Sequence, residues 1–493
     1  MLFRCARFAV SAFKLEHPDP HRYNRRLFSK KGPVMFAGFD YGTSNCALGV
    51  IRRGEEASTE VKLLGLDQDS VLLPSNLYAL DRSLVCEYVA GRIADPDVRE
   101  SYLASRPNAA GQAQRARREL SIGSDEQVLC VGRQAVDLHI EAPDEGFYIK
   151  SPKSFLGSGG LSRPQLDFIE DVVTAMMIWA KSQAEVSAGA ELPQAVIGRP
   201  VNYQGADSDA ANPQAMEIMT SAAQRAGFKD FEFMYEPLAA GVNFESRMQQ
   251  DQVLLVVDIG GGTTDCSMVR MGPSHRNNDN RSDDFLAHCG QRTGGNDLDI
   301  YLTYKGLMPL FGLGTDKKSG LTMPTQPFWN AIEINNVRTQ AEFSARQTRD
   351  DIAQLCRDAR RPDLLSRLLL LQEGRKSYQL VRSGEQAKIE LSDADAHEVN
   401  LDYIEKGLSQ PLDRAMLGEA IQNPLNRIID IVREALKLAQ CRPDLVYLTG
   451  GSGKSPVIRA ALEQELGDIP VVDGDFFGSV AAGLTQWAAK IYR

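Results

Sequence analysis

The chain has 493 residues, 43% of them hydrophobic and 24% charged, a composition typical of globular proteins with two or three domains. Its formal net charge of −10 argues against nucleic acid as a partner, because binding a phosphate backbone requires concentrated Lys and Arg. No apolar run approaches the ~18 residues that span a membrane, so we expect no membrane association. The eight cysteines and six histidines show no CxxC, HxH or HExxH spacing. This predicts a reducing, cytoplasmic location and no metal site built from side chains alone.

The first 34 residues differ from the remainder of the chain. They are rich in Lys and Arg, as in a transit peptide, but the acidic residues and prolines around "HPDPHR" do not fit that pattern. We therefore interpret residues 1–34 as an extension that is disordered or not native, with true initiation at Met35.

From Met35 onward, short strand patterns alternate with longer helical patterns. "MFAGFD" and "CALGVI" are predicted strands around a Gly-Thr-Ser turn. Residues 83–127 are polar and Arg-rich, and we predict a helical insertion there. "QLDFIEDVVTAMMIWAKSQAEV" has the apolar spacing of a long amphipathic helix, and "QAVIGRP" is a short strand ended by Pro200.

The pattern then starts again at "QVLLVVDIGGGTTDCSMVRM". Its strand, aspartate, glycine turn and second strand repeat those of "MFAGFDYGTSNCALGVI", with Asp258 in the place of Asp40. A third strand-to-glycine turn, "LVYLTGGSG", lies near the C-terminus. The sequence therefore predicts an internally duplicated α/β protein.

Both aspartate-led turns have the chemistry of a phosphate site. Gly42 permits a sharp turn after Asp40, and the three glycines of Gly260–Gly262 permit close approach to the backbone after Asp258. Such turns offer backbone N–H groups to an anion, while an aspartate at a strand end can hold Mg²⁺ through water. The triple glycine is the stronger signal, because a structural bulge needs only one or two.

Two further patterns are ambiguous by themselves. Glu385 and Lys388 lie three apart on a predicted helix, where an isolated pair is usually a surface ion pair. "LTGGSGKS" is not a Walker A loop, because Leu448 stands where that motif requires glycine. We interpret its double glycine as room for a flat ring against the backbone.

Taken in order, these segments resemble the nucleotide-binding domain of the DnaK-type chaperones, the heat-shock protein 70 family, and most closely its YegD-like bacterial members. The resemblance runs from about Met35 to the C-terminus. "FDYGTSN" and "VVDIGGGTTD" are similar to the two phosphate loops of the family, and "AVIGRPVNY" to its hinge-proline segment. Further motifs follow in the family's order: "LLPSNLYAL", which precedes the hinge, then "YEPLAAG", "RTGGNDLD", "GEQAKIELS" and "LTGGSGKSP".

The resemblance implies an actin-like ATPase fold, with duplicated RNase H-like lobes and a nucleotide cleft between them. Lobe I would comprise residues 35–249 and 473–493, with the insertion at about 83–127, and lobe II residues 250–472. ATP or ADP would bind with Mg²⁺, which Asp40 and Asp258 would orient through water.

The resemblance also implies site residues. Lys153 of "KSFLG" would reach the γ-phosphate, with Lys150 as the alternative, and Glu236 would position the attacking water. The implied catalytic residues are Asp40, Lys153, Glu236, Asp258 and Thr263. The implied nucleotide-binding residues are Gly42, Thr43, Ser44, Asn45, Gly260, Gly261, Gly262, Thr263, Gly294, Gly295, Glu385, Lys388, Ser392, Gly450, Gly451, Ser452 and Lys454.

This sequence departs from the family at three places. Ile389 stands where the family usually has an arginine that stacks on adenine, and Lys454 replaces another arginine near the base. The chain ends at Arg493, so we expect no peptide-binding β-sandwich. The resemblance implies a slow ATPase switch, a chaperone or chaperone-like regulator acting on an unknown protein client. A sugar-type small-molecule kinase and an actin-like nucleotide-dependent scaffold are the alternatives.

Overall fold

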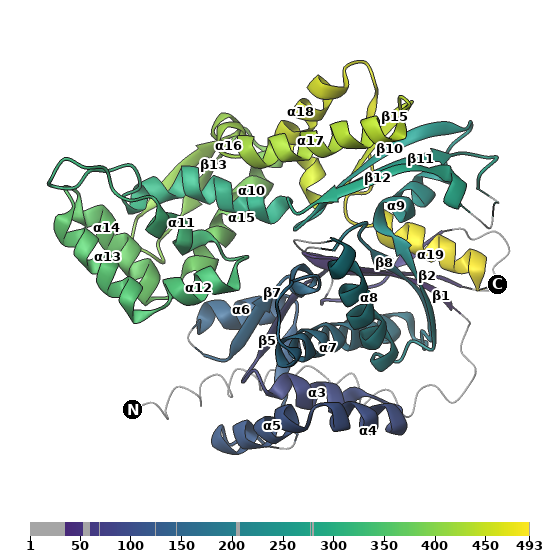
Figure 1. Cartoon of the computed structure of the whole chain (residues 1–493), viewed down its shortest axis with the longest axis horizontal. Helices are drawn as coiled ribbons and strands as arrows, with labels where there is room; N and C mark the ends of the chain where they lie inside the picture. The colour runs from purple at the N-terminus through teal and green to yellow at the C-terminus, as the bar shows by residue number, and fades with distance from the viewer. Residues whose placement is uncertain are drawn as a thin grey trace. The chain divides into compact units, whose positions relative to one another are not determined.

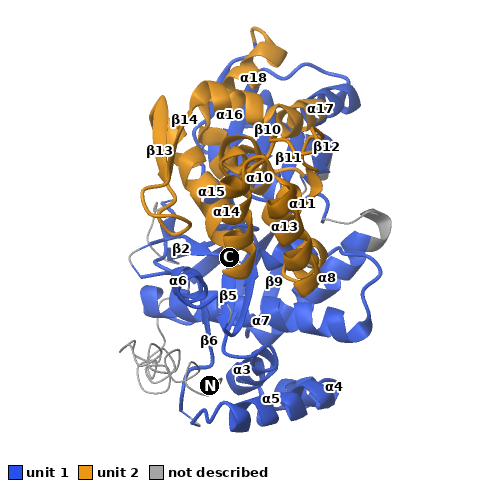
Figure 2. Ribbon diagram, turned by 90° about the vertical axis from the view of Figure 1, so that its left-hand side faces the viewer, with its two compact units in different colours: residues 1–292, 431–450, 469–493 blue, residues 293–430, 451–468 orange. Residues whose placement is uncertain are grey.

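The structure is a computed structural model that describes residues 35–52, 60–68, 70–123, 125–143, 145–203, 208–276, 278 and 281–492. The extension predicted for residues 1–34 lies outside the described residues. The chain divides into two compact units (Figure 2). Unit 1 contains the chain up to Arg292, Ile431–Gly450 and the chain from Ile469 onward, and unit 2 contains Thr293–Asp430 and Gly451–Asp468. The predicted lobes divide the chain differently, and they stay a prediction.

Unit 1 contains two principal sheets that repeat one topology (Figure 1). The first has the order β3-β2-β1-β8-β9, with β4 paired to β2, and the second has the order β12-β11-β10-β15-β16. The strands of the first are β1 Met35–Tyr41, β2 Asn45–Arg52, β3 Lys62–Leu63, β4 Leu73–Pro74, β8 Gln194–Arg199 and β9 Asp230–Tyr235. Those of the second are β10 Gln252–Ile259, β11 Thr264–Met271, β12 Phe285–Gln291, β15 Leu445–Thr449 and β16 Val471–Asp473.

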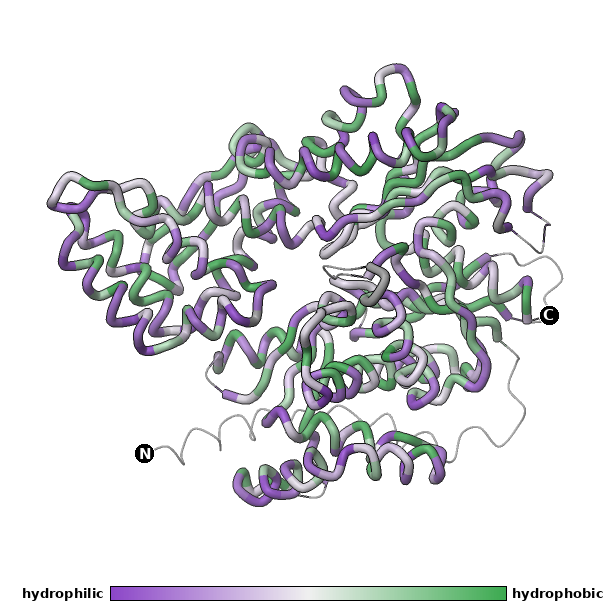
Figure 3. Tube along the Cα trace, in the orientation of Figure 1, coloured by the Kyte–Doolittle hydropathy of each residue, from purple (hydrophilic) through white to green (hydrophobic). Residues whose placement is uncertain are grey.

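The two sheets agree in direction as well as in order. β1 pairs antiparallel with β2 and parallel with β8, just as β10 pairs antiparallel with β11 and parallel with β15. The apolar runs of β1 and β10 are buried almost throughout, as expected for central strands covered on both faces, and Figure 3 shows the hydrophobic character of both. The predicted duplication is confirmed.

The helices of unit 1 begin and end where the sequence provides signals. The long helix α7, Arg163–Ala188, starts with a capping box between Ser162 and Gln165 and ends at Gly189, whose φ of 67° suits a glycine. α9, Glu236–Glu245, and α19, Ser479–Ile491, pack closely, since a Cβ on Gly483 would lie 1.7 Å from the carbonyl oxygen of Ala239. The other helices of unit 1 are α3 Leu84–Arg92, α4 Pro96–Ser105, α5 Pro107–Glu119, α6 Arg133–Glu141, η1 Pro152–Phe155, α8 Ser208–Arg225 and η2 Ser282–Asp284. A smaller sheet has the order β6-β5-β7, with β5 Asn76–Ala79, β6 Leu129–Val131 and β7 Phe147–Lys150.

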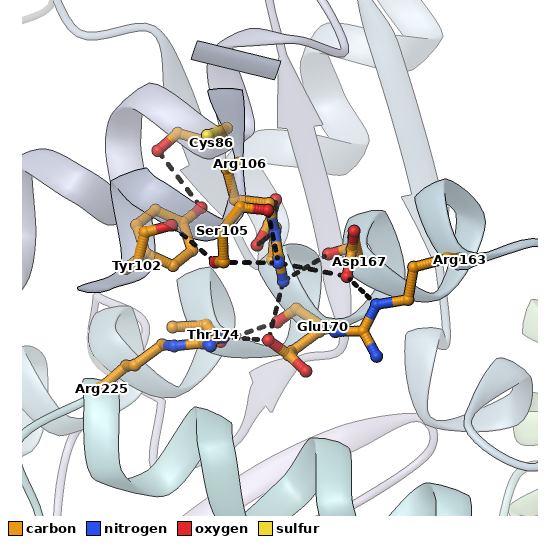
Figure 4. Close-up of polar contacts among 10 residues, drawn as sticks. Cys86, Tyr102, Ser105, Arg106, Arg163, Asp167, Glu170, Thr174 and Arg225 are labelled. Atoms are coloured by element: carbon orange, nitrogen blue, oxygen red, sulfur yellow. Dashed lines mark hydrogen bonds and ion pairs between the residues drawn. The ribbon is translucent and has the colours of Figure 1, made fainter. Parts of the chain in front are cut away.

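The helices predicted within residues 83–127 are confirmed as α3, α4 and α5, of which α5 is mostly hydrophilic (Figure 3). Arg106, between α4 and α5, is only 4% exposed and contacts three carboxylates of α7 (Figure 4). Its guanidinium lies 3.1 Å from Asp167, 2.8 Å from Glu170 and 3.1 Å from Asp171. Arg225 of α8 also pairs with Glu170. This buried cluster fastens the helical segment to α7.

Unit 2 is mostly helical, with one hairpin of β13 Ala396–Asn400 and β14 Ser409–Asp413. Its helices are α10 Gly295–Leu302, η3 Thr303–Leu307, η4 Met308–Phe311, α11 Gln326–Ile332, α12 Val337–Phe343, α13 Arg346–Asp358, α14 Pro362–Glu373, α15 Ser377–Asp393, α16 Arg414–Ala420, η5 Gly451–Lys454 and α18 Pro456–Leu466. α17, Gln422–Ala439, begins in unit 2 and ends in unit 1. Among the described helices, none combines the length and apolar character required to cross a membrane.

Candidate functional site

Two glycine turns at the ends of central strands form the core of the site, and both belong to unit 1. Gly42, Thr43 and Ser44 join β1 to β2, and a Cβ on Gly42 would lie 2.1 Å from the carbonyl oxygen of Asn45. The second turn joins β10 to β11, and the N–H of Gly260 donates to the carbonyl oxygen of Thr263 over 2.9 Å. Both turns are therefore tight at their first glycine.

The two turns lie against each other. A Cβ on Gly261 would lie 1.7 Å from Oγ and 2.9 Å from Cβ of Ser44, so only glycine permits this approach. Turns of this kind offer backbone N–H groups to a bound anion. The structure thus brings together the two turns that the sequence predicted as phosphate loops, although they are more than 200 residues apart.

The aspartates that lead the turns influence each other electrostatically. Burial raises the pKa of Asp40 well above its ordinary value, the charge of Glu236 raises it further, Lys153 opposes the rise, and Asp258 adds to it. Burial, with the charges of Glu236 and Asp265, raises the pKa of Asp258 to about 8. As whole residues, both aspartates are partly exposed.

Lys153 and Glu236 form a buried ion pair beside these aspartates. Lys153 Nζ lies 2.5 Å from Glu236 Oε1, and the side chains are 5% and 10% exposed. Burial lowers the pKa of Lys153, but the charges of Glu236 and Asp40 outweigh that effect and raise it. Lys153 therefore stays charged. Lys150, the alternative considered from sequence, ends β7 and is partly exposed.

The sequence motifs did not single out Asp265, the last residue of "GGGTTD". Asp265 is 3% exposed, and burial, with the charge of Glu236, raises its pKa to about 7. Its carboxylate accepts hydrogen bonds from Thr263 and from the backbone of Val201, while its Oδ1 has no partner among the residues that the structure describes. The pairing register of the β10–β11 hairpin is the signal that could have identified Asp265, because it places Asp265 directly opposite Asp258.

The charges of this site favour a divalent cation. Asp40, Glu236, Asp258 and Asp265 contribute four carboxylates, while Lys153 contributes a single positive charge among them. Within the described part of the chain, no group of three or more His, Cys, Asp or Glu side chains could itself hold a metal ion. One or two carboxylates acting through water, with phosphate oxygens as the other ligands, is the usual arrangement for Mg²⁺. The residues present fit that arrangement.

A second group of predicted residues lies in unit 2. Glu385, Lys388 and Ser392 are on α15, and Gly294 and Gly295 are at the start of α10. Lys388 Nζ donates to the carbonyl oxygen of Gly295 over 3.2 Å, so the structure brings these two segments together.

Lys388 has a buried acidic partner on α10 that its spacing did not suggest. It lies 2.6 Å from Asp299 Oδ1, whose side chain is 2% exposed. The neighbouring Ile389 is 50% exposed, so its apolar surface is available for contact.

The third glycine turn divides between the two units. Gly450, with a φ of 81°, belongs to unit 1, and a Cβ on it would lie 2.5 Å from Asp258 Oδ1. Gly451, Ser452 and Lys454 form η5 in unit 2, directly before α18. The sequence resemblance alone connects the residues of η5 with a nucleotide base.

The two sheets repeat one strand order, and in each sheet a central strand carries an aspartate near its end and leads into a glycine turn. This arrangement defines the actin-like class of ATPase folds, as the sequence resemblance predicted. A family model described as "Hsp70 protein" matches residues 163–303 and 367–485, more than half of the chain. The chain therefore belongs to the Hsp70 family. The narrower likeness to YegD-like members stays a prediction.

Two relatives show how similar the chain is to known proteins. The chain is 25% identical over 237 residues to "Chaperone protein HscA homolog" of Histophilus somni strain 129Pt, covering 48% of this chain and 33% of that protein. It is 23% identical over 475 residues to "Heat shock 70 kDa protein 13" of Pongo abelii, covering 91% of this chain and 86% of that protein. The chain thus spans about a third of the HscA homologue that it matches.

Proposed function

We propose that this protein binds ATP with Mg²⁺, hydrolyses it slowly, and uses the cycle as a switch on a protein client. The observation that carries the proposal is the buried pair of Lys153 and Glu236 beside Asp40 and Asp258, next to two touching glycine turns. In phosphoryl transfer a protein mainly positions the reactants and neutralises charge, and these residues suit both tasks.

Each residue would have a separate role. The N–H groups of the turns at Gly42–Ser44 and Gly260–Thr263 would hold phosphate oxygens. Lys153 would neutralise charge on the terminal phosphate, and Glu236 would orient water. Asp40 and Asp258 would hold Mg²⁺ through water, and the ion would neutralise the phosphates and draw them toward the carboxylates.

The other predicted residues would contact the nucleoside, as the family resemblance implies. Glu385, Lys388 and Ser392 would bind ribose and one edge of adenine, and Gly450, Gly451, Ser452 and Lys454 would bind the other side. The exposed side chain of Ile389 would give an apolar contact to the base where the family usually has arginine. Broader base selectivity than in other family members is the expected consequence. The two predicted lobes, their closure on nucleotide and the cytoplasmic location belong to this proposal as well.

The test compares the chain with Lys153→Ala, using Lys150→Ala as the matched control. Calorimetry with MgATP and MgADP measures binding, and single-turnover assays measure hydrolysis. Lys153→Ala should retain nucleotide binding and lose hydrolysis by about 100-fold or more, as when a preorganised charge-stabilising donor is removed. Lys150→Ala should behave as the unmodified chain.

Three outcomes would contradict the proposal. No affinity for adenine nucleotides would remove the function altogether, and equal turnover in Lys153→Ala would remove Lys153 from the mechanism. ATP consumption that depends on an added sugar or metabolite would favour the kinase alternative instead.

A further inference from the structure

Ser75 lies between two sheets of unit 1, at the point where the chain passes from one to the other. It follows β4, which pairs with β2 of the first principal sheet, and it precedes β5, the central strand of the three-stranded sheet. Ser75 is 1% exposed. Because the strands on both sides of it are paired, its backbone is held in place relative to both sheets.

Two hydrogen bonds connect Ser75 to the glycine turn between β1 and β2. Its N–H donates to the carbonyl oxygen of Ser44 over 2.8 Å, and its hydroxyl donates to the carbonyl oxygen of Gly42 over 2.8 Å. In a planar trans peptide the N–H points in the direction opposite to the C=O. Since Ser75 holds both carbonyl groups, the N–H groups of Thr43 and Asn45 point away from it. Both residues are among those predicted to bind nucleotide.

A neighbouring thiol fixes the direction of the hydroxyl bond. Cys46 Sγ lies 3.6 Å from Ser75 Oγ, and burial raises the pKa of Cys46 to about 12, so the thiol keeps its proton. A hydroxyl has one proton to donate and two lone pairs to accept with. The thiol can therefore donate to Ser75 Oγ while the hydroxyl proton stays on Gly42.

The carbonyl group of Ser75 holds the segment that carries Lys153. It accepts a hydrogen bond of 2.7 Å from the N–H of Ser151, directly after the pairing of β5 with β7. Ser151 has φ 54° and ψ 53°, a left-handed conformation that serine rarely adopts. Residues in such conformations cluster at functional sites, where they help to preorganise their neighbours. Lys153 follows two residues later in η1, so its backbone is positioned from Ser75.

We propose that Ser75 is a positioning residue of the nucleotide site, which fixes the N–H groups of the glycine turn and the segment of Lys153 relative to each other. The proposal rests on the proposed ATPase function and adds to it a residue too buried to act on the nucleotide directly. A lysine stabilises the transition state only when it is correctly placed against the phosphate oxygens that the turn holds. A loosened turn should therefore slow hydrolysis more than it weakens binding.

Ser75→Ala tests this role because it removes the hydroxyl and leaves the two backbone hydrogen bonds. Single-turnover hydrolysis should fall about tenfold, while the dissociation constant for MgATP rises less than about threefold, since a small displacement affects the rate more than binding. Ser75→Thr keeps the hydroxyl and should restore hydrolysis to within about twofold of the unmodified chain. The matched control is Thr174→Val, which removes a buried hydroxyl that donates to the carbonyl oxygen of Glu170 in α7 over 2.7 Å. It should leave hydrolysis unchanged.

Hydrogen–deuterium exchange tests the same contacts without nucleotide. Peptides that cover residues 40–48 should exchange at least about fivefold faster in Ser75→Ala than in the unmodified chain, because the turn loses one of its two bonds to Ser75. The same peptides should exchange equally fast in Thr174→Val and in the unmodified chain.

The outcomes separate the two proposals. Unchanged hydrolysis in Ser75→Ala overturns the role of Ser75, and so does an equal loss in Ser75→Thr, because packing rather than the hydroxyl would then explain the effect. If the unmodified chain neither binds nor hydrolyses ATP, the proposed function fails, yet exchange still tests whether Ser75 holds the turn. Equal exchange of residues 40–48 in Ser75→Ala and the unmodified chain overturns that.

Discussion

Replacing Asp258 with asparagine should stabilise the nucleotide-free protein, although it should impair function. Asp258 has a pKa of about 8 in the folded protein, compared with 3.8 for an ordinary aspartate. Between these pH values the folded state binds more protons at Asp258 than the unfolded state does. The free energy of unfolding therefore falls as pH rises through this window.

The magnitude follows from the same pKa values. One pH unit corresponds to about 1.36 kcal/mol for one fully linked group, so the window from 3.8 to about 8 amounts to about 5–6 kcal/mol. The amide of asparagine would retain the shape of the aspartate side chain without its charge. We expect Asp258→Asn to raise the free energy of unfolding at pH 8 by about 2–5 kcal/mol, and to change little near pH 4.

Tryptophan fluorescence makes the measurement specific for unit 1. Two of the three tryptophans, Trp179 and Trp487, lie in unit 1, so a Trp329→Phe background removes the signal from unit 2. Urea unfolding is then followed from pH 4 to 8 in EDTA without nucleotide. The matched control is Asp137→Asn, which neutralises an exposed carboxylate on α6.

The reasoning is refuted if the stability difference between Asp258→Asn and the starting protein does not grow from pH 4 to pH 8. It is also refuted if Asp258→Asn is less stable at pH 8. With MgATP the order should reverse, because only the protein with aspartate would gain stability from the bound ion.

Three further predictions concern other parts of the protein. Gly261→Ala should weaken MgATP binding at least tenfold in calorimetry, since the added Cβ would collide with Ser44. The control, Gly111→Ala, adds a Cβ in open space and should leave the affinity unchanged. Equal affinities in the two variants would contradict the contact between the turns. Arg106→Met should lower the free energy of unfolding of unit 1 by about 3–5 kcal/mol in urea, because buried carboxylates lose their partner. The control, Arg163→Met, removes an exposed arginine and should cost about 1 kcal/mol or less. Similar losses in the two variants would refute the stabilising role of the buried Arg106 cluster. Removing Mg²⁺ with EDTA should lower ATP affinity at least tenfold in the same calorimeter, and an unchanged affinity would exclude the carboxylates from ion binding.

Much of the fold could be predicted because its signals are local. Each strand, helix or turn is specified by residues within it or a few positions away. These signals are the spacing of apolar residues, the proline after β8 and the glycines of each turn. The repeated Asp-Gly pattern at Asp40 and Asp258 also predicted the duplication that the two sheets confirm. The same signals predicted the two turns that the structure places in contact.

Side-chain partnerships over long distances could not be predicted in this way. Lys153 and Glu236 are 83 residues apart, and the residues around each one do not indicate that the two side chains pair. Asp265 becomes a candidate only when its unpartnered oxygen is seen in the buried site, and Arg106 only when α7 supplies three carboxylates. Strands, helices and turns could be read from the chain because neighbouring residues set local backbone conformation. The set of charges that are buried together emerged only from the packed fold, because burial and pairing depend on how distant elements meet.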